Sequence, residues 1–220
     1  RRWYTEWNID VDGEVEPWNI KHKRVLIDNE SSSLGDTIAW MPYIEEFRKK
    51  HSCEVFYASS YNNLFDKEYP EINFIGKGEV VDRLYATYKL GWWFDDLSYH
   101  PKDCREIPLQ QTATDILGLD YKEIKPKMVI PDEPRRMEEP YVCIGIHGTS
   151  QCKYWNRKDG WQKIVDYLNE KGYKVVLISK EYSFGIEPFM NYPPENIIDK
   201  TGDYSLEDRM VDLKYAEFYI

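Results

Sequence analysis

The sequence of 220 residues lacks a concentration of positive charge and lacks long apolar runs. It carries 29 lysines and arginines against 39 aspartates and glutamates, which gives a formal net charge of −10. Nucleic-acid binding normally requires a concentrated basic face, so this balance argues against DNA and RNA as partners. No apolar run approaches the roughly 20 residues that cross a bilayer, and no signal peptide precedes the first expected strand. The sequence therefore predicts a soluble, cytoplasmic chain with no membrane span.

Cysteine is scarce, and the short motifs of several enzyme classes are absent. None of the four cysteines belongs to a C-x-x-C pair, so we expect reduced thiols and neither a zinc ribbon nor a disulfide framework. Cys143, His147 and Cys152 fall close together, but a thiol within a strand usually packs in a core, so we predict no metal site here. No G-x-G-x-x-G follows a strand, Gly76-Lys77-Gly78 lacks the rest of a P-loop, and no H-E-x-x-H occurs. Dehydrogenases, NTPases and zincins therefore lose support.

Strands and helices alternate in the first half of the sequence. The apolar run 23–28 predicts a strand, and a helical pattern follows through Lys50 with its apolar residues on one face. Pro42 predicts that the regular helix begins near Met41, because proline inside a helix removes a backbone hydrogen bond. Further expected elements are strands at 54–59 and 73–75 and a helix at 109–117 that ends at Gly118.

The same alternation restarts after a segment rich in proline and in charges of both signs. This segment, 131–140, predicts a linker between a domain at 1–130, with an N-terminal strand extension, and a domain at 141–220. The second domain is expected to contain strands at 141–146, 174–179 and 217–220. A helix at 161–171 is expected to be capped by Asp159 with Gln162, and a later helix by Ser205 with Asp208. Such alternation implies doubly wound parallel sheets, so we predict an α/β fold of two Rossmann-like domains facing a cleft.

The first candidate site is the segment 31–37 (SSSLGDT), between the first strand and its helix. Ligands of parallel sheets bind at this carboxyl edge. Gly35 would let the backbone turn sharply and approach a ligand, Thr37 is a further candidate for substrate binding, and Asp36 could deprotonate an acceptor hydroxyl. The alternative is that Asp36 simply caps the following helix, which requires no substrate.

Two further candidate loops follow strands of the second domain. In the segment 147–155, Thr149 and Ser150 can donate hydrogen bonds, and Lys153 offers a charge to a diphosphate leaving group. The alternative interpretation is a polar surface loop with an exposed lysine. Residues 179–181, which include Lys180 and Glu181, could bind sugar hydroxyls or could form a plain solvated turn.

The residues 33–51 (SLGDTIAWMPYIEEFRKKH) resemble the ADP-heptose glycosyltransferases of family nine, and most closely the bacterial autotransporter heptosyltransferases. In that family a Gly-Asp pair opens the first helix and the aspartate is regarded as the base, so the resemblance implies that Asp36 activates an acceptor hydroxyl. The family's hydroxyl-rich loop implies donor diphosphate contacts at these positions: Thr149, Ser150, Lys153 and Trp155. Glu181 aligns with a sugar-binding acid of the family. The similarity begins near Lys21 and continues to the end.

The resemblance also implies partners and a missing segment. Family members modify serines of autotransporter adhesins and assemble into large rings, which implies a protein acceptor and a homo-oligomer. The family's phosphate-holding helix start would follow Ile220, and its iron-binding cysteine cluster lies still further on. We therefore expect a chain truncated within its second domain, with no cofactor of its own and with iron in the full-length protein.

Taken together, these expectations describe an inverting GT-B enzyme that transfers heptose from ADP-heptose to a serine hydroxyl. One alternative is transfer from another nucleotide sugar to a glycan acceptor. The other alternative is a binding or assembly fragment without turnover, which the abundance of aromatic residues favours. With 18 tyrosines and 8 tryptophans, some aromatic side chains must line grooves or interfaces.

Overall fold

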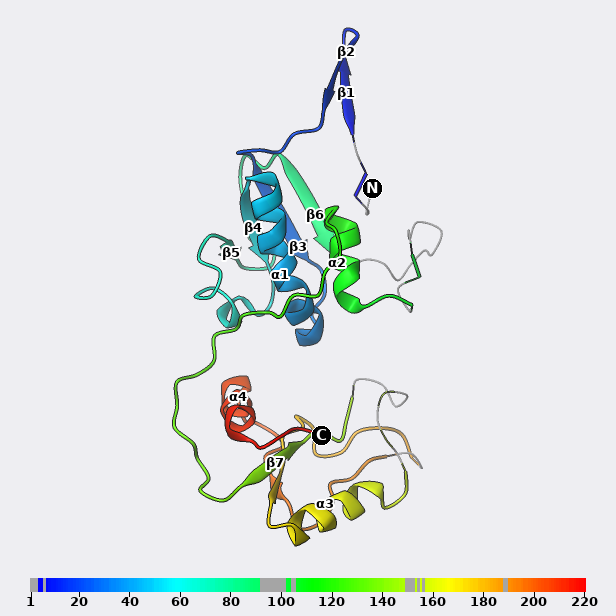
Figure 1. Cartoon of the computed structure of the whole chain (residues 1–220), viewed down its shortest axis with the longest axis vertical. Helices are drawn as coiled ribbons and strands as arrows, with labels where there is room; N and C mark the ends of the chain where they lie inside the picture. Colours follow the sequence, from blue (N-terminus) through cyan, green and yellow to red (C-terminus); the bar gives the residue numbers. More distant parts are fainter. Residues whose placement is uncertain are drawn as a thin grey trace. The chain divides into compact units, whose positions relative to one another are not determined.

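The computed structural model describes residues 4–5, 7–91, 102–103, 106–148, 153, 155, 157–187 and 190–220. The chain divides into two compact units, Arg1–Val129 and Ile130–Ile220 (Figure 1). Each unit is built on a parallel sheet of its own.

Unit 1 contains a parallel sheet of four strands in the order β5-β4-β3-β6. The strands are β3 (Arg24–Asn29), β4 (Glu54–Ala58), β5 (Asn73–Ile75) and β6 (Ala86–Leu90). The first three confirm the predicted strands. Strand β6 was not predicted, because it lies at the sheet edge and alternates half-buried with exposed residues, including Lys89, instead of forming an apolar run.

Helix α1 (Leu34–His51) begins well before Met41, so the predicted start was wrong. Pro42 lies inside the helix, where a proline typically costs about 3 kcal/mol. Burial of apolar and aromatic side chains on the helix offsets this cost, among them Trp40 and Phe47, which are both 0% exposed. Trp40 also donates its indole N–H to the Leu109 carbonyl oxygen (3.0 Å), so tertiary packing decides the helix boundary here.

Helix α2 (Leu109–Leu117) packs beside α1 and ends as predicted at Gly118 (Figure 1). Gly118 has a φ of 66°, in the left-handed region that glycine adopts without strain.

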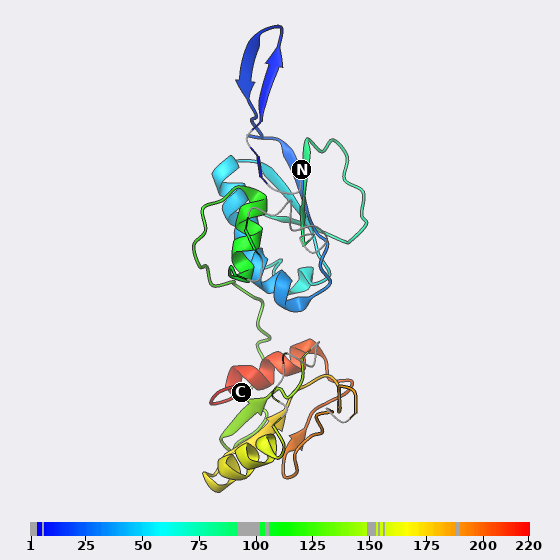
Figure 2. The ribbon, with the colours of Figure 1, turned by 90° about the vertical axis from the view of Figure 1, so that its right-hand side faces the viewer.

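The N-terminal extension forms an antiparallel hairpin of β1 (Asn8–Val11) and β2 (Glu14–Pro17), all of whose residues are exposed. Figures 1 and 2 show this hairpin standing away from the sheet of unit 1.

Unit 2 contains a parallel sheet in the order β7-β8-β9, with a helix on each face (Figure 2). The elements are β7 (Tyr141–Ile144), α3 (Gly160–Glu170), β8 (Lys174–Leu177), β9 (Ile198–Asp199) and α4 (Leu206–Tyr215). Val142 and Ile144 face one core cluster with Val165 of α3, whereas Cys143 faces another with Tyr215 of α4. The predicted strand at 217–220 is a single parallel bridge between Tyr219 and Cys143.

The two predicted helix caps of unit 2 have different outcomes. The Ser205 hydroxyl accepts a hydrogen bond from the Asp208 N–H (3.0 Å) and the Asp208 carboxylate accepts one from the Ser205 N–H (3.1 Å), which confirms the capping box. Asp159 makes no side-chain cap, so that prediction was wrong. Its φ of 56° is left-handed, unlike the extended backbone of an ordinary capping residue.

Part of the segment 131–140 contacts α4. Arg136 pairs with Asp208 (2.7 Å), and the Tyr215 hydroxyl donates to the Glu133 carbonyl oxygen (2.8 Å). Hydrogen bonds from Ser205 and Arg136 lower the pKa of Asp208 to about 2, so this pair persists in mildly acidic solution. The Val129 N–H, just before this segment, donates to the Leu64 carbonyl oxygen of unit 1 (2.8 Å). The assignment of 131–140 as a linker stays a prediction.

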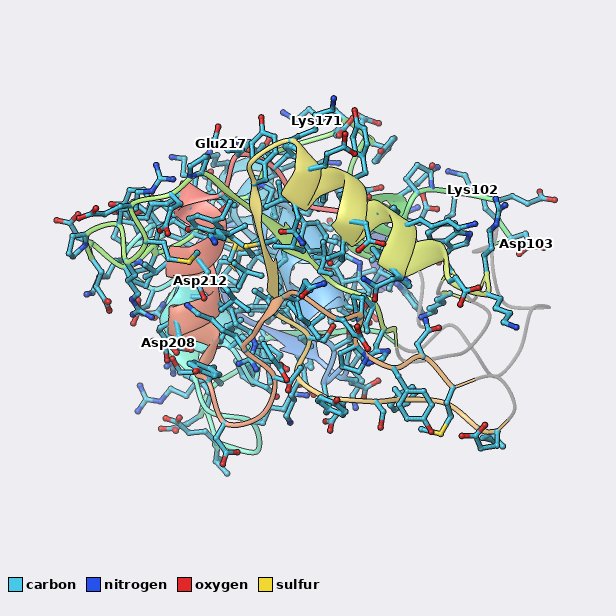
Figure 3. All side chains as sticks on the ribbon, turned by 90° about the horizontal axis from the view of Figure 1, so that it is seen from below. Lys102, Asp103, Lys171, Asp208, Asp212 and Glu217 are labelled. Atoms are coloured by element: carbon cyan, nitrogen blue, oxygen red, sulfur yellow. The ribbon has the colours of Figure 1, made fainter. Side chains whose placement is uncertain are left out.

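A buried ion pair attaches α4 to the sheet of unit 2. The Lys200 ammonium lies 2.7 Å from Oδ1 of Asp212, and the two side chains are 14% and 2% exposed. The backbone carbonyl of Asp212 also accepts a hydrogen bond from the Tyr141 hydroxyl (2.7 Å). In Figure 3, Asp212 and Asp208 both project from α4.

Replacing Lys200 with Met should lower the free energy of unfolding of unit 2 by about 3–5 kcal/mol, because the buried Asp212 carboxylate loses its counter-charge. Denaturant unfolding with hydrogen exchange of the β7 amides measures this change. Lys163→Met removes an exposed lysine of α3 and should shift stability by less than about 0.5 kcal/mol. Equal stability of the Lys200→Met variant and the parent chain would contradict the importance of the pair.

Candidate active site

The segment between β3 and α1 presents Asp36 at the carboxyl edge of the sheet of unit 1. Asp36 is half-buried in the first turn of α1, and its Oδ2 accepts a hydrogen bond from the Ser31 hydroxyl (2.6 Å). The helix is capped by Ser33, whose hydroxyl accepts the Asp36 N–H (3.5 Å). Asp36 is therefore not the helix cap, and its carboxylate is available for other chemistry.

A buried amide fixes the loop that precedes Asp36. Asn29 is 0% exposed, and its amide nitrogen donates to the hydroxyls of Thr37 (3.0 Å) and Tyr57 (3.1 Å). Its Oδ1 accepts the Ser31 N–H (3.0 Å). Burial raises the pKa of the Tyr57 hydroxyl, which therefore stays protonated as part of this network.

Gly35 and Thr37 occupy different environments from those expected. Gly35 is exposed within α1, so the predicted sharp turn is absent, and an added Cβ would meet only the Ser33 hydroxyl at 3.8 Å. Thr37 is completely buried and donates its hydroxyl to the Ser33 carbonyl oxygen (3.0 Å), so it supports the loop from inside. Contact of Gly35 and Thr37 with substrate stays a prediction.

Side chains from the neighbouring strands reach the same edge. Lys77, which follows β5, donates to the Ser31 carbonyl oxygen (3.0 Å), and the Tyr61 hydroxyl after β4 donates to the Ser32 carbonyl oxygen (3.1 Å). Gly91, after β6, lies so close that an added Cβ would be 3.1 Å from the Ser31 nitrogen. These contacts were not predicted, and for Lys77 the only sequence signal is its position just after a strand.

The predicted donor loop of unit 2 is described in part. Thr149 and Ser150 lie outside the described residues, whereas Lys153 is exposed and Trp155 is 43% exposed. The Trp155 ring packs edge-on against Trp161, with ring centres 5.7 Å apart. The Asn191 amide donates to the carbonyl oxygens of Ile146 (3.0 Å) and Trp155 (3.2 Å), which ties together the two ends of the loop.

Lys180 and Glu181 are exposed directly after β8, at the carboxyl edge of the second sheet. The backbone carbonyl of Lys180 accepts the Gly202 N–H (2.8 Å). Arg209 of α4 donates to the carbonyl oxygens of Ile178 (3.0 Å) and Gly202 (3.0 Å), so one guanidinium joins the loops that follow β8 and β9. This role of Arg209 was not predicted, because all of its partners are backbone carbonyl groups that leave no sequence motif.

The cysteines that the structure describes are buried and unsuited to ligation. Burial raises the pKa of Cys53 to about 11, and burial together with the negative charge of Asp212 raises the pKa of Cys143 to about 12. Cys104 and Cys152 lie outside the described residues. Among the residues that the structure describes, no three His, Cys, Asp or Glu side chains are grouped so that they could hold a metal ion.

A cavity of about 340 Å³ lies elsewhere in unit 1, and its lining includes the aromatic side chains of Tyr4, Trp18 and Tyr88. It contains none of the predicted site residues.

Within the described ranges, none of the helices is long and apolar enough to span a bilayer.

Comparison with known proteins identifies sequence relatives, and some of them match the whole chain. The chain is 34% identical over 231 residues to the autotransporter heptosyltransferase Aah of Escherichia coli, covering 100% of this chain and 59% of Aah. It is 30% identical over 161 residues to the inactive autotransporter heptosyltransferase BimC of Burkholderia thailandensis, covering 71% of this chain and 38% of BimC. The chain thus spans less than two thirds of the length of these relatives. No family model matches the sequence.

A crystal structure supports the same relationship. The iron-containing dodecameric glycosyltransferase TibC of E. coli matches with a TM-score of 0.88 and 30% identity, covering 99% of this chain and 59% of TibC. TibC has also been solved in complex with ADP-D-β-D-heptose. The likeness confirms the predicted fold class, because the chain has the GT-B fold of TibC over the part that it spans.

Cys53 and Cys143 should resist alkylation by iodoacetamide at pH 8 in the native chain, because thiols with pKa values near 11 and 12 are almost entirely protonated there. Unfolding in denaturant should restore ordinary reactivity at both positions. Peptide mass spectrometry locates and quantifies the label. Fast native labelling of Cys143 would show that its surroundings are more open than the structure indicates.

Proposed function

The chain belongs to the autotransporter heptosyltransferase family, which it matches along its full length, and we propose that it is part of a glycosyltransferase. We propose ADP-heptose as the donor and a serine hydroxyl of an autotransporter adhesin as the acceptor. The relatives that support this proposal act as heptosyltransferases, and TibC binds ADP-D-β-D-heptose.

The observation that carries the proposal is the carboxylate of Asp36 at the carboxyl edge of a parallel sheet. Its Oδ2 is held by the Ser31 hydroxyl at 2.6 Å, and its Oδ1 forms no hydrogen bond with any described residue. In the proposed reaction, Oδ1 of Asp36 accepts the proton of the acceptor hydroxyl while the oxygen of that hydroxyl attacks the sugar carbon. The bond from this carbon to the phosphate oxygen breaks, and ADP leaves with the electron pair.

The second unit supplies the proposed donor contacts. Lys153 is exposed beside Trp155, and its ammonium would stabilise the negative charge that develops on the leaving diphosphate. Thr149 and Ser150 would donate further hydrogen bonds to the diphosphate, as the resemblance implies. Lys180 and Glu181 are exposed on the loop that Arg209 and Gly202 hold, where they would bind sugar hydroxyls.

A second candidate function is binding or assembly without turnover, and the relative BimC favours it because BimC is an inactive autotransporter heptosyltransferase. Transfer from another nucleotide sugar to a glycan is a further alternative, which a panel of donors separates from the first. Oligomerisation and iron content are proposed by analogy with TibC, which is dodecameric and contains iron. The cytoplasmic location remains a prediction.

Asp36→Asn should lower the rate of heptose transfer by about 10²–10⁴-fold, because the amide keeps the size of the carboxylate but cannot accept the proton. Donor binding should be unchanged. The assay is transfer to the adhesin by the full-length protein, with intact-mass detection of the product. Asp82→Asn changes an exposed aspartate before β6 and should leave the rate unchanged. Wild-type turnover by Asp36→Asn would exclude Asp36 as the base.

ADP-heptose and ADP should stabilise the protein against thermal unfolding, whereas UDP-glucose and GDP-mannose should not. A ligand present at 100 times its Kd adds about 2.7 kcal/mol, and a tenfold loss of affinity in Lys153→Ala would reduce this to about 1.4 kcal/mol. Lys158→Ala changes an exposed lysine three residues after the segment 147–155 and is the matched control. Equal stabilisation by all four ligands would contradict a site that is selective for ADP-heptose.

A further inference from the structure

We propose that Ser31 is a positioning residue that orients the Asp36 carboxylate for proton transfer. The proposal rests on the proposed function, since it concerns the same base. Ser31 lies five positions before Asp36, in the loop between β3 and α1, and its hydroxyl donates to Oδ2 at 2.6 Å. Because this hydroxyl occupies one carboxylate oxygen, the other oxygen is left for the acceptor.

The hydrogen bonds of the carboxylate support different roles for its two oxygens, one held by Ser31 and the other left to accept the proton. Oδ2 of Asp36 accepts the Ser31 hydroxyl, whereas Oδ1 accepts no hydrogen bond from any residue that the structure describes. A carboxylate that rotated freely would present its oxygens in many directions, and reaction geometry is sensitive to shifts of about 1 Å. The Ser31 hydrogen bond therefore fixes which oxygen takes the proton and where it lies.

Ser31 can act in this way because its own backbone is held on both sides. Its N–H donates to Oδ1 of the fully buried Asn29 (3.0 Å), and its carbonyl oxygen accepts the Lys77 ammonium (3.0 Å). Asn29 is in turn fixed by its hydrogen bonds to Thr37 and Tyr57. A continuous set of contacts thus leads from the interior of the sheet, through Ser31, to the base.

The neighbouring serines differ from Ser31 in their contacts. Ser33 caps α1, so its replacement would change the helix itself. Ser32 is exposed, and its hydroxyl makes no hydrogen bond with any described residue. Ser32→Ala is therefore a control with the same chemical change, one position away. The Ser31 hydroxyl also accepts the Ser33 N–H (3.0 Å), so a test must separate positioning of Asp36 from support of the loop.

The test compares Ser31→Ala, Ser31→Thr, Ser31→Cys and Ser32→Ala in the full-length protein, with kcat, both KM values and thermal unfolding measured for each. We expect Ser31→Ala and Ser31→Cys to lower kcat about 10- to 100-fold with KM values for donor and acceptor unchanged. Ser31→Thr keeps the hydroxyl and should restore most of kcat. Ser32→Ala should match the parent protein.

Three results would overturn the proposal: unchanged kcat in both Ser31→Ala and Ser31→Cys, a loss in Ser32→Ala as large as in Ser31→Ala, or a rise in KM instead of a fall in kcat. If Ser31→Ala does not fold, Ser31→Cys and Ser31→Thr still decide between the outcomes. Asp36→Asn is measured in parallel. Full activity of Asp36→Asn would refute the role of Asp36 as the base. If Asp36→Asn is inactive but Ser31→Ala is fully active, only the positioning role of Ser31 is refuted.

Discussion

The buried amide of Asn29 is the constraint on which the proposed acceptor-side site depends. An amide removed from water without hydrogen-bond partners costs about 1–3 kcal/mol, so the surrounding chain must supply donors and acceptors. Tyr57, Thr37 and the backbone of Ser31 do so, from β4, from α1 and from the loop between β3 and α1. Meeting this requirement sets the path of the loop and thereby the position at which Asp36 emerges.

The same logic governs the edge of the second sheet, where backbone carbonyl groups need donors. The side chains of Arg209 and Asn191 each donate hydrogen bonds to several loop carbonyl oxygens. Asn191 joins Trp155 to Ile146 just after β7, and Arg209 joins the loops that follow β8 and β9. The exposed Lys180 and Glu181 therefore project from a backbone that hydrogen bonds hold in place. Both units therefore present candidate side chains at the carboxyl ends of parallel strands, Asp36 in the first unit and Lys180 with Glu181 in the second.

The sequence was sufficient where a structure is decided locally. Gly118 ends α2 and Ser205 pairs with Asp208 because the partners lie within a few residues of each other. The helix start predicted from Pro42 was wrong because the packing of Trp40 and Phe47 against distant parts of the chain outweighs the local preference of proline. The position of Asp36 could be predicted because it follows a strand. Its hydrogen bond with Ser31, and the hydrogen bond from Lys77 to the Ser31 carbonyl oxygen, could not be predicted. Those contacts depend on how β3 and β5 are arranged in the sheet, which no short motif encodes.

In the proposed reaction a single carboxylate, Asp36, acts as the base, and no second carboxylate attacks the sugar. The anomeric configuration of the transferred heptose tests this most directly, measured by NMR on the acceptor after reaction with ADP-D-β-D-heptose. A direct displacement assisted by one base inverts the sugar carbon, so we predict an α-linked product. A β-linked product would require a covalent intermediate or an attack from the leaving-group side, and either would contradict the role assigned to Asp36.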